Sequence, residues 1–112
     1  MARAILLAAI VCLLVVPSVS ADRISKQQAR ARPVICKVFG KACQEALAVS
    51  YCESKWYVWA VNPHGDYRGL FQMGPSERAH YGHGPGAWAQ SRAAYRYYVD
   101  SGRDWSPWSC RP

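Results

Sequence analysis

The spacing of four cysteines is the feature that most restricts how this chain can fold. Cys36, Cys43, Cys52 and Cys110 follow a short N-terminal region, and an even number of cysteines in a small exported protein indicates disulfide bonds. If Cys43 and Cys52 share one helix, nine residues at about 1.5 Å each place them roughly 13 Å apart. A disulfide spans at most about 7 Å between Cα atoms. Two pairings therefore remain, and we expect the one that joins Cys36 to Cys43 and Cys52 to Cys110.

Residues 1–21 have the pattern of a signal peptide. Arg3 supplies the positive charge, residues 4–16 are an unbroken apolar run, and the small residues Val19, Ser20 and Ala21 precede the expected cleavage site. The run covers 13 residues, whereas a helix that spans a membrane needs about 20. We therefore expect export, no stable membrane insertion, and one small mature domain.

The mature chain is basic, and its charge narrows the range of partners. Loss of Arg3 leaves 14 − 1 = 13 Lys and Arg against 7 Asp and Glu, a net charge of +6 with neutral histidines. Such a chain favours anionic partners such as cell-wall polymers, membrane surfaces or nucleic acid. The basic residues are scattered and form no nucleic-acid-binding motif, so nucleic acid is not an expected partner.

No metal or other cofactor is expected. The CxxC spacing typical of zinc sites is absent from the sequence. His80 and His83 lie in the glycine-rich segment HYGHGPG, which is typical of a solvated loop. We also expect the protein to be a monomer.

The chain beyond the signal peptide divides into a leader and one helix-rich domain. Residues 22–33, DRISKQQARARP, contain one large apolar residue and are expected to form a basic flexible leader. A short helical turn that ends at Gly40 should follow, then a helix over about 41–56. A second long helix is expected over about 87–101, with Gly102 as its stop.

Turns and a C-terminal segment complete the predicted domain. Residues 62–69, NPHGDYRG, have the composition of a turn, or of a minimal hairpin. The segment DWSPWSC, residues 104–110, is too aromatic for a solvated linker and should pack back on the domain. We therefore predict an α-rich (α+β) domain over 34–112, with its helices around a cleft.

Glu53 stands out because it continues an apolar stripe. Four residues of the helix expected over 41–56 recur at spacings of three and four and so share one face: Ala42, Ala46, Val49 and Glu53. Partial burial and the negative end of the helix dipole would both disfavour an ionised Glu53, which suits a general acid. The alternative is a structural ion pair with Lys55 or Arg68.

The residues that follow Glu53 resemble those of a known family. Ser54 comes directly after it, an Asn-Pro pair begins at Asn62, and the segment GLFQ begins at Gly69, sixteen positions after the glutamate. This order and spacing resembles the lytic transglycosylase and lysozyme-like superfamily. There a catalytic glutamate in a Glu-Ser pair ends a helix, and a G-L-[FM]-Q segment lines the cleft.

The resemblance extends over about residues 38–110. The segments VFG, ERAHYGHG and WSPWSC are similar to those of small secreted members found in actinobacteria. Two features depart from the common pattern: the turn is one residue longer, and Gly74 stands where many relatives carry a larger apolar residue. The resemblance implies a lysozyme-like fold with a substrate cleft.

The resemblance also implies roles for single residues. Glu53 matches the catalytic acid and base, and Asn62 matches a Ser or Asn that helps to hold the sugar's substituents. Gln72 matches the glutamine of the G-L-x-Q segment, while Gly69 lets that backbone approach closely. Tyr95 lies where a helix tyrosine faces the catalytic carboxyl, and Tyr97 and Tyr98 are alternatives to it.

Lytic transglycosylases cleave the β-1,4 link between MurNAc and GlcNAc in peptidoglycan with one glutamate, which acts as acid and then base. The resemblance therefore implies a secreted, cell-wall-associated enzyme that acts on glycan strands and gives 1,6-anhydro-muramyl products. A hydrolytic lysozyme that uses Glu53 and Asp66 remains an alternative. An Asp-Tyr pair ahead of G-x-x-Q, here Asp66 and Tyr67, also occurs in animal-type lysozymes. Asp66 is otherwise a turn residue. A non-catalytic cell-wall-binding module is a third possibility.

Overall fold

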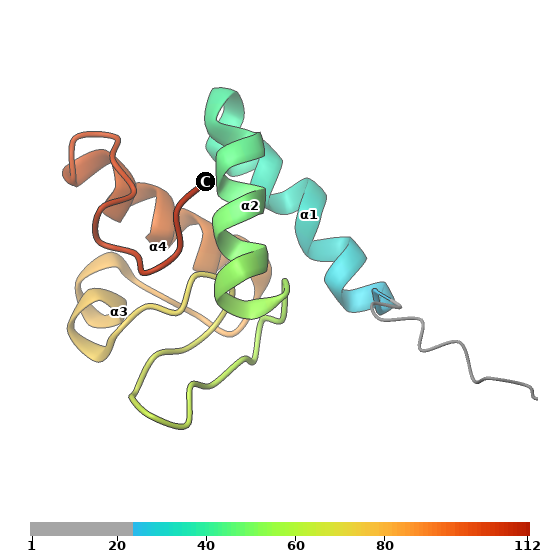
Figure 1. Cartoon of the computed structure of the whole chain (residues 1–112), viewed down its shortest axis with the longest axis horizontal. Coiled ribbons are helices and arrows are strands. Elements are labelled where there is room, and N and C mark those ends of the chain that lie inside the picture. Colours follow the sequence, from blue (N-terminus) through green and yellow to red (C-terminus); the bar gives the residue numbers. More distant parts are fainter. Residues whose placement is uncertain (1–23) are drawn as a thin grey trace, which may run out of the picture.

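The computed structural model describes residues 24–112, most of which are helical. The elements are α1 (Lys26–Phe39), the 3-10 helix η1 (Gly40–Ala42), α2 (Cys43–Ser54), α3 (Pro75–Tyr81) and α4 (Ala87–Asp100). Helix α1 packs against both α2 and α4, and α3 packs against α4 (Figure 1). The prediction of an α-rich domain is confirmed. The predicted signal peptide and residues 22–23 of the leader lie outside the described residues.

The prediction of a flexible leader is wrong for residues 26–33, which form the first turns of α1. Ser25 and Gln28 close a capping box, because the Ser25 hydroxyl accepts the Gln28 N–H at 3.2 Å and the Gln28 amide oxygen accepts the Ser25 N–H at 2.6 Å. Pro33 lies inside the helix although its ring removes one backbone hydrogen bond.

Helix α1 is held on the domain by a stripe of buried side chains. These recur at spacings of three and four, and they are Gln28, Ala31, Ile35 and Phe39. The N-terminal half of the stripe consists of a glutamine and an alanine. Neither is a large apolar residue, so the composition of residues 22–33 did not predict that this segment is buried. Gln28 also donates from its amide nitrogen to the Lys55 carbonyl at 2.8 Å and so caps the end of α2.

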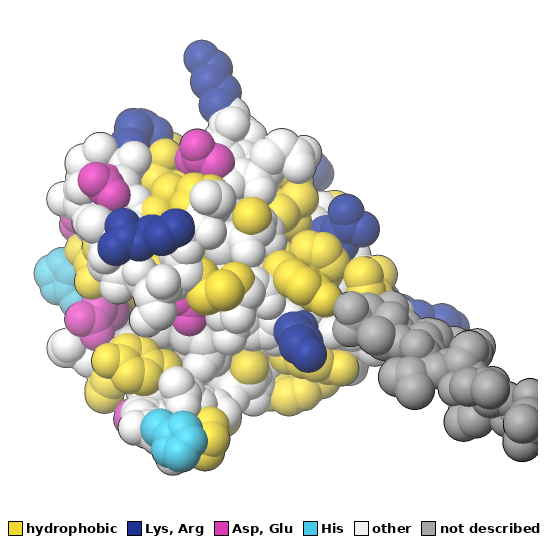
Figure 2. Space-filling model, in the orientation of Figure 1, with side chains coloured by type: hydrophobic (Ala, Val, Ile, Leu, Met, Phe, Trp, Pro, Cys, Tyr) yellow, Lys and Arg dark blue, Asp and Glu magenta, His cyan; other side chains and the backbone are white. Residues whose placement is uncertain are grey.

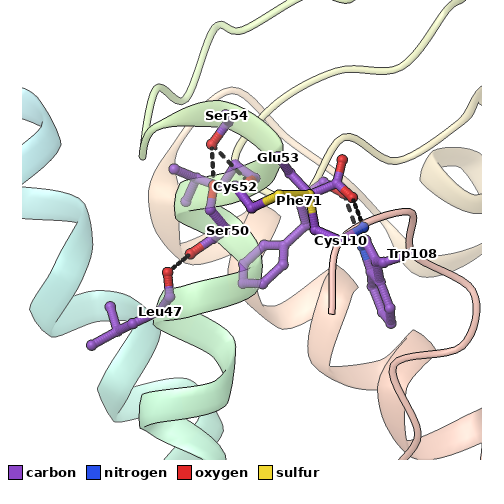
Figure 3. Close-up of a disulfide and its surroundings, with 9 residues drawn as sticks. Leu47, Ser50, Cys52, Glu53, Ser54, Phe71, Trp108 and Cys110 are labelled. Atoms are coloured by element: carbon purple, nitrogen blue, oxygen red, sulfur yellow. Dashed lines mark hydrogen bonds between the residues drawn. A yellow bond between two sulfur atoms is a disulfide. The ribbon is translucent and has the colours of Figure 1, made fainter. Parts of the chain in front are cut away.

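Both predicted disulfides are present. Cys36–Cys43 joins the end of α1 to the start of α2 across η1, with the Cα atoms 4.4 Å apart. Cys52–Cys110 joins the last turn of α2 to the C-terminal segment, with the Cα atoms 6.0 Å apart (Figure 3).

The C-terminal segment packs into the core, as predicted. Trp105 and Trp108 are each 5% exposed, and the Trp105 ring stacks with Phe39 at 5.5 Å. Both buried indole N–H groups have acceptors: Trp108 donates to the Phe71 carbonyl at 2.9 Å, and Trp105 donates to the Glu45 carboxylate at 2.9 Å. The segment therefore contributes two large side chains to the core of a small domain.

Helix α3 was not predicted, whereas α4 lies within one residue of its predicted bounds. Pro75 begins α3 at a position where its missing N–H costs nothing. His80 is therefore an exposed helical residue, and only His83 lies in the following loop, where it is half-buried. Burial, with a smaller contribution from Arg78, lowers the pKa of His83.

The segment between α2 and α3 is a loop with little backbone pairing. Among the described residues there are only two isolated antiparallel bridges, Val61 with Arg68 and Arg68 with Met73. The predicted minimal hairpin is thus reduced to these bridges. On the face shown in Figure 2, basic side chains are spread out with acidic ones among them. Within residues 24–112 no helix is long and apolar enough to cross a membrane.

The packing of the first turns of α1 predicts a contrast between two neighbouring alanines. Ala31 is 1% exposed whereas Ala29 is exposed. Ala31→Glu should lower the free energy of unfolding by about 3 kcal/mol or more, because it buries an unpaired charge. Ala29→Glu should change it by less than about 0.5 kcal/mol. Urea denaturation of the full chain measures both, and equally small effects would show that residues 26–33 do not pack on the domain.

Candidate active site

A groove of about 230 Å³ lies beside the C-terminal end of α2. Its walls come from the loop between α2 and α3, the start of α3, the last turn of α4 and the C-terminal segment. Three of the predicted site residues, Glu53, Asn62 and Gln72, line it. The structure thus brings together side chains that are up to 19 positions apart in sequence (72 − 53).

Glu53 is held in place by the C-terminal segment. It is the penultimate residue of α2 and half-buried, and its Oε1 atom accepts the Cys110 backbone N–H at 3.0 Å (Figure 3). The neighbouring Cys52 is bonded to the same Cys110. No residue of the described chain donates to Oε2 of Glu53 or forms an ion pair with it, so the predicted alternative of a structural ion pair with Lys55 or Arg68 is wrong.

Ser54 joins the end of α2 to the GLFQ segment. Its buried hydroxyl lies 2.9 Å from the Ser50 carbonyl (Figure 3). It also lies 2.8 Å from the Leu70 carbonyl and accepts the Trp56 N–H at 3.1 Å. A hydroxyl has one proton to donate and can accept as well, which suits this position. The serine of the Glu-Ser pair is therefore a structural residue that fixes the loop relative to Glu53.

Gly69 lies behind the groove and does not line it. Its φ of +79° favours glycine, and a Cβ atom there would lie 2.6 Å from Oε1 of Gln90. Gln90 is 2% exposed, accepts the Leu70 N–H at 2.9 Å and donates to the Val58 carbonyl at 2.7 Å. Gly69 thus permits the close approach that was predicted, but toward α4, which corrects its assignment as a substrate-binding residue.

Gln90 itself was missed by the sequence analysis. No motif marks it, and it anchors residues that are 20 and 32 positions away in sequence. The one available signal is its place one helical turn before Ala94, on the buried face of α4. That signal predicts that Gln90 is buried, but it does not identify the groups to which Gln90 forms hydrogen bonds.

The two predicted amide residues are partly used by the loop. Gln72 donates from its amide nitrogen to the Ala60 and Gly69 carbonyls at 3.1 and 3.0 Å. Asn62 accepts the His64 N–H on its side-chain oxygen at 2.9 Å. Within residues 24–112 the amide oxygen of Gln72 and the amide nitrogen of Asn62 have no partner, so one acceptor and one donor are available to a ligand in the groove.

Tyr95 is a wrong prediction, and Tyr97 takes its place. Tyr95 packs edge-on against Phe39 at 5.4 Å, on the other side of α4. Tyr97 lines the groove, with its ring 5.0 Å from that of Trp108. Two residues along a helix correspond to a rotation of about 200°, so Tyr95 and Tyr97 face opposite sides of α4. Burial chiefly, and then the negative charge of Glu77, raise the pKa of Tyr97.

Asp66 does not line the groove, which corrects its assignment to the site. Its carboxylate pairs with Arg68 Nε at 2.8 Å and with Arg78 Nη2 at 3.2 Å. The hydrogen bond from Arg68 is the main cause that lowers the pKa of Asp66. Arg78 also donates to the Asp66 and Met73 carbonyls, so Asp66 and Arg78 together hold the turn against α3.

A second carboxylate does line the groove, and it belongs to Glu77. The sequence analysis missed this residue because it did not predict α3, which carries Glu77 in its first turn. Within residues 24–112 no three His, Cys, Asp or Glu side chains are grouped closely enough to hold a metal ion.

The crowding around Gly69 predicts a difference between two glycines that share a left-handed conformation. Gly69 and Gly102 have φ values of +79° and +78°, but a Cβ atom at Gly102 would meet no atom within 4 Å. Gly102→Ala should cost about 1 kcal/mol of stability from backbone strain alone. Gly69→Ala should cost about 2 kcal/mol more, because it also displaces Gln90. Equal losses in thermal denaturation would contradict the described packing.

No family model matches the chain, and no curated protein or solved structure is significantly similar to it. A function for this protein therefore has to be argued from the groove itself. The groove offers a fixed glutamate, two amides with free polar atoms, and aromatic walls.

Proposed function

We propose that this protein is an exported enzyme that cleaves the β-1,4 MurNAc–GlcNAc bond of peptidoglycan, and that it acts as a lytic transglycosylase. One observation carries the proposal: Glu53 has one carboxylate oxygen fixed by the Cys110 N–H and the other free, at the edge of a groove that also contains Asn62 and Gln72. A carboxyl group held in one orientation next to a substrate cleft is what general acid catalysis requires.

In this reaction Glu53 acts twice. Its protonated form donates the proton to the glycosidic oxygen while the bond from that oxygen to C1 of the muramic acid breaks. The resulting carboxylate then takes the proton of the C6 hydroxyl as its oxygen forms the new bond to C1. The 1,6-anhydro ring closes, Glu53 recovers its proton, and no water is consumed.

The walls of the groove suit a glycan strand. Tyr67 is 50% exposed, and it lines the groove together with Tyr97 and Trp108. Aromatic faces pack against the C–H surfaces of sugars, and their polar edges form hydrogen bonds. The free polar atoms of Asn62 and Gln72 match the hydroxyl and acetamido groups of such a substrate. We propose a lysozyme-like arrangement on the same ground, with α2 as the helix that ends at the catalytic glutamate.

The proposed substrate also implies where the protein acts and what it binds. Peptidoglycan lies outside the cytoplasmic membrane, in the compartment where disulfides persist, and the protein contains two disulfides. The signal-peptide pattern of residues 1–21 and the basic net charge agree with action on an anionic cell wall. We propose that the protein acts there as a monomer and without a cofactor.

Hydrolysis is the second candidate, and one observation favours it. Hydrolytic glycosidases commonly need a second carboxylate, and Glu77 supplies one in the groove, whereas Asp66 does not. A hydrolase would leave reducing ends on its products. The masses of the products therefore separate the two reactions, since an anhydro-muramyl end lacks the water that hydrolysis adds.

Loss of the proposed acid should abolish cleavage without unfolding the protein. Glu53→Gln should lower the rate of muropeptide release from purified peptidoglycan by about 10²- to 10⁴-fold, because an amide cannot donate and recover the proton. Its thermal denaturation should match that of the wild type, since the amide oxygen can still accept the Cys110 N–H. Asp100→Asn is the control, because it removes one exposed carboxylate outside the groove. Unchanged activity of Glu53→Gln would show that Glu53 is not the acid, whereas no muropeptide release by the wild type would leave only a non-catalytic binding module.

The second test concerns the type of reaction. Mass spectrometry should find 1,6-anhydro-muramyl ends, and Asp66→Asn should keep most of the activity, because Asp66 holds the turn and does not face the substrate. Reducing ends in the products of the wild type would show that the enzyme is a hydrolase.

A further inference from the structure

Glu77 is a half-buried carboxylate that faces the groove without a cationic partner. Its Oε2 atom accepts the Ser76 hydroxyl at 3.1 Å. Over residues 24–112 no Lys, Arg or His lies within ion-pair distance of it. The adjacent Arg78 is occupied by the Asp66 carboxylate and by two carbonyl oxygens. Carboxylates in partly buried sites are usually paired or used, so this one needs an explanation.

Gly74 provides the space that Glu77 occupies. A Cβ atom at Gly74 would lie 2.7 Å from Oε2 of Glu77, which is too close for both to stay in place. The backbone of Gly74, with φ −72° and ψ 171°, is open to any residue. The chain conformation therefore does not require glycine here, whereas a side chain at this position would make the Glu77 carboxylate shift.

The charge of the groove is opposite to the charge of the protein. Two carboxylates, Glu53 and Glu77, line it and no Lys or Arg does, although the whole chain has a net charge of +7. The negative charge of Glu77 also reaches α4, where it contributes to raising the pKa of Tyr97. Such a groove repels anionic substituents and attracts a cationic group or a strong hydrogen-bond donor.

We propose that Glu77 is a specificity-determining residue that binds a primary ammonium group on the glycan substrate. The inference rests on the proposed function, because it assumes that the groove of Glu53 receives the glycan strand. The ammonium group has two possible sources in such a strand: a glucosamine unit that lacks its acetyl group, or the side-chain amine of a diamino acid in the stem peptide. A carboxylate binds either through charge-assisted hydrogen bonds.

Binding to the Glu53→Gln protein tests the proposal without turnover. If glucosamine is the source of the ammonium group, calorimetry with the tetramer of glucosamine and the tetramer of N-acetylglucosamine should give at least about tenfold tighter binding of the charged sugar. Adding Glu77→Gln should remove that preference, and raised salt should weaken it. Gly74→Ala should weaken it, because the methyl group makes the carboxylate shift while the charge of the chain is kept. Asp100→Asn should leave the preference unchanged.

A second arm identifies the source of the amine. Fully N-acetylated glycan strands that carry stem peptides with a free diamino-acid amine are compared with strands in which that amine is acetylated. Glucosamine as the source predicts a preference in the tetramer arm only, and the stem amine predicts a preference in this arm only. No preference in either arm, or one that Glu77→Gln leaves unchanged, would overturn the proposal.

Two other roles for Glu77 give different results. If it activates water, Glu77→Gln abolishes turnover of every substrate without changing the binding preference. If it only stabilises the start of α3, Glu77→Gln lowers the melting temperature and leaves the binding preference intact. Either result contradicts ammonium recognition. A preference for glucosamine in a protein that cleaves no peptidoglycan would instead contradict the proposed function alone.

Discussion

The disulfide between Cys52 and Cys110 is the constraint on which the groove depends. It fixes the C-terminal segment to the last turn of α2, and the same Cys110 donates its N–H to Glu53. Trp108, two residues earlier, forms one wall of the groove and is anchored by its bond to the Phe71 carbonyl. The Cys52–Cys110 disulfide joins residues 58 positions apart. Because it closes a loop of this length in the unfolded chain, the disulfide stabilises the fold by about 4 kcal/mol. One covalent link thus supports stability and the orientation of the proposed catalytic carboxylate.

The opposite wall is held by side chains, because the loop between α2 and α3 has almost no sheet. Ser54 and Gln90 bond to the carbonyl and the N–H of Leu70, which are buried and would otherwise have no partner. Arg78 adds a second hydrogen bond to the Met73 carbonyl, which already accepts the Arg68 N–H. Networks of this kind rigidify a loop when every member is satisfied. The amides of Asn62 and Gln72 can then present fixed polar atoms to a ligand.

Three carboxylates around the same loop have different roles because their partners differ. Asp66 is neutralised by two guanidinium groups and holds a turn. Glu53 receives one backbone N–H and keeps a free oxygen. Glu77 has only a neighbouring hydroxyl and rests in space left by Gly74. Their chemical type is nearly the same, so only their surroundings separate a structural residue from a proposed acid and a proposed binding residue.

Local rules applied to the sequence were enough for α2, α4, both disulfides and the position of Glu53. The helical period places Glu53 on the face of Ala46 and Val49, and the length of α2 keeps Cys43 and Cys52 too far apart to bond. Tertiary structure alone decided that Gln28 and Ala31 are buried, that Tyr97 and not Tyr95 meets the groove, and that Glu77 and not Asp66 is its second carboxylate. Periodicity shows which side chains share a face, but which face becomes buried depends on contacts between segments that are distant in sequence, and a local pattern carries no information about them.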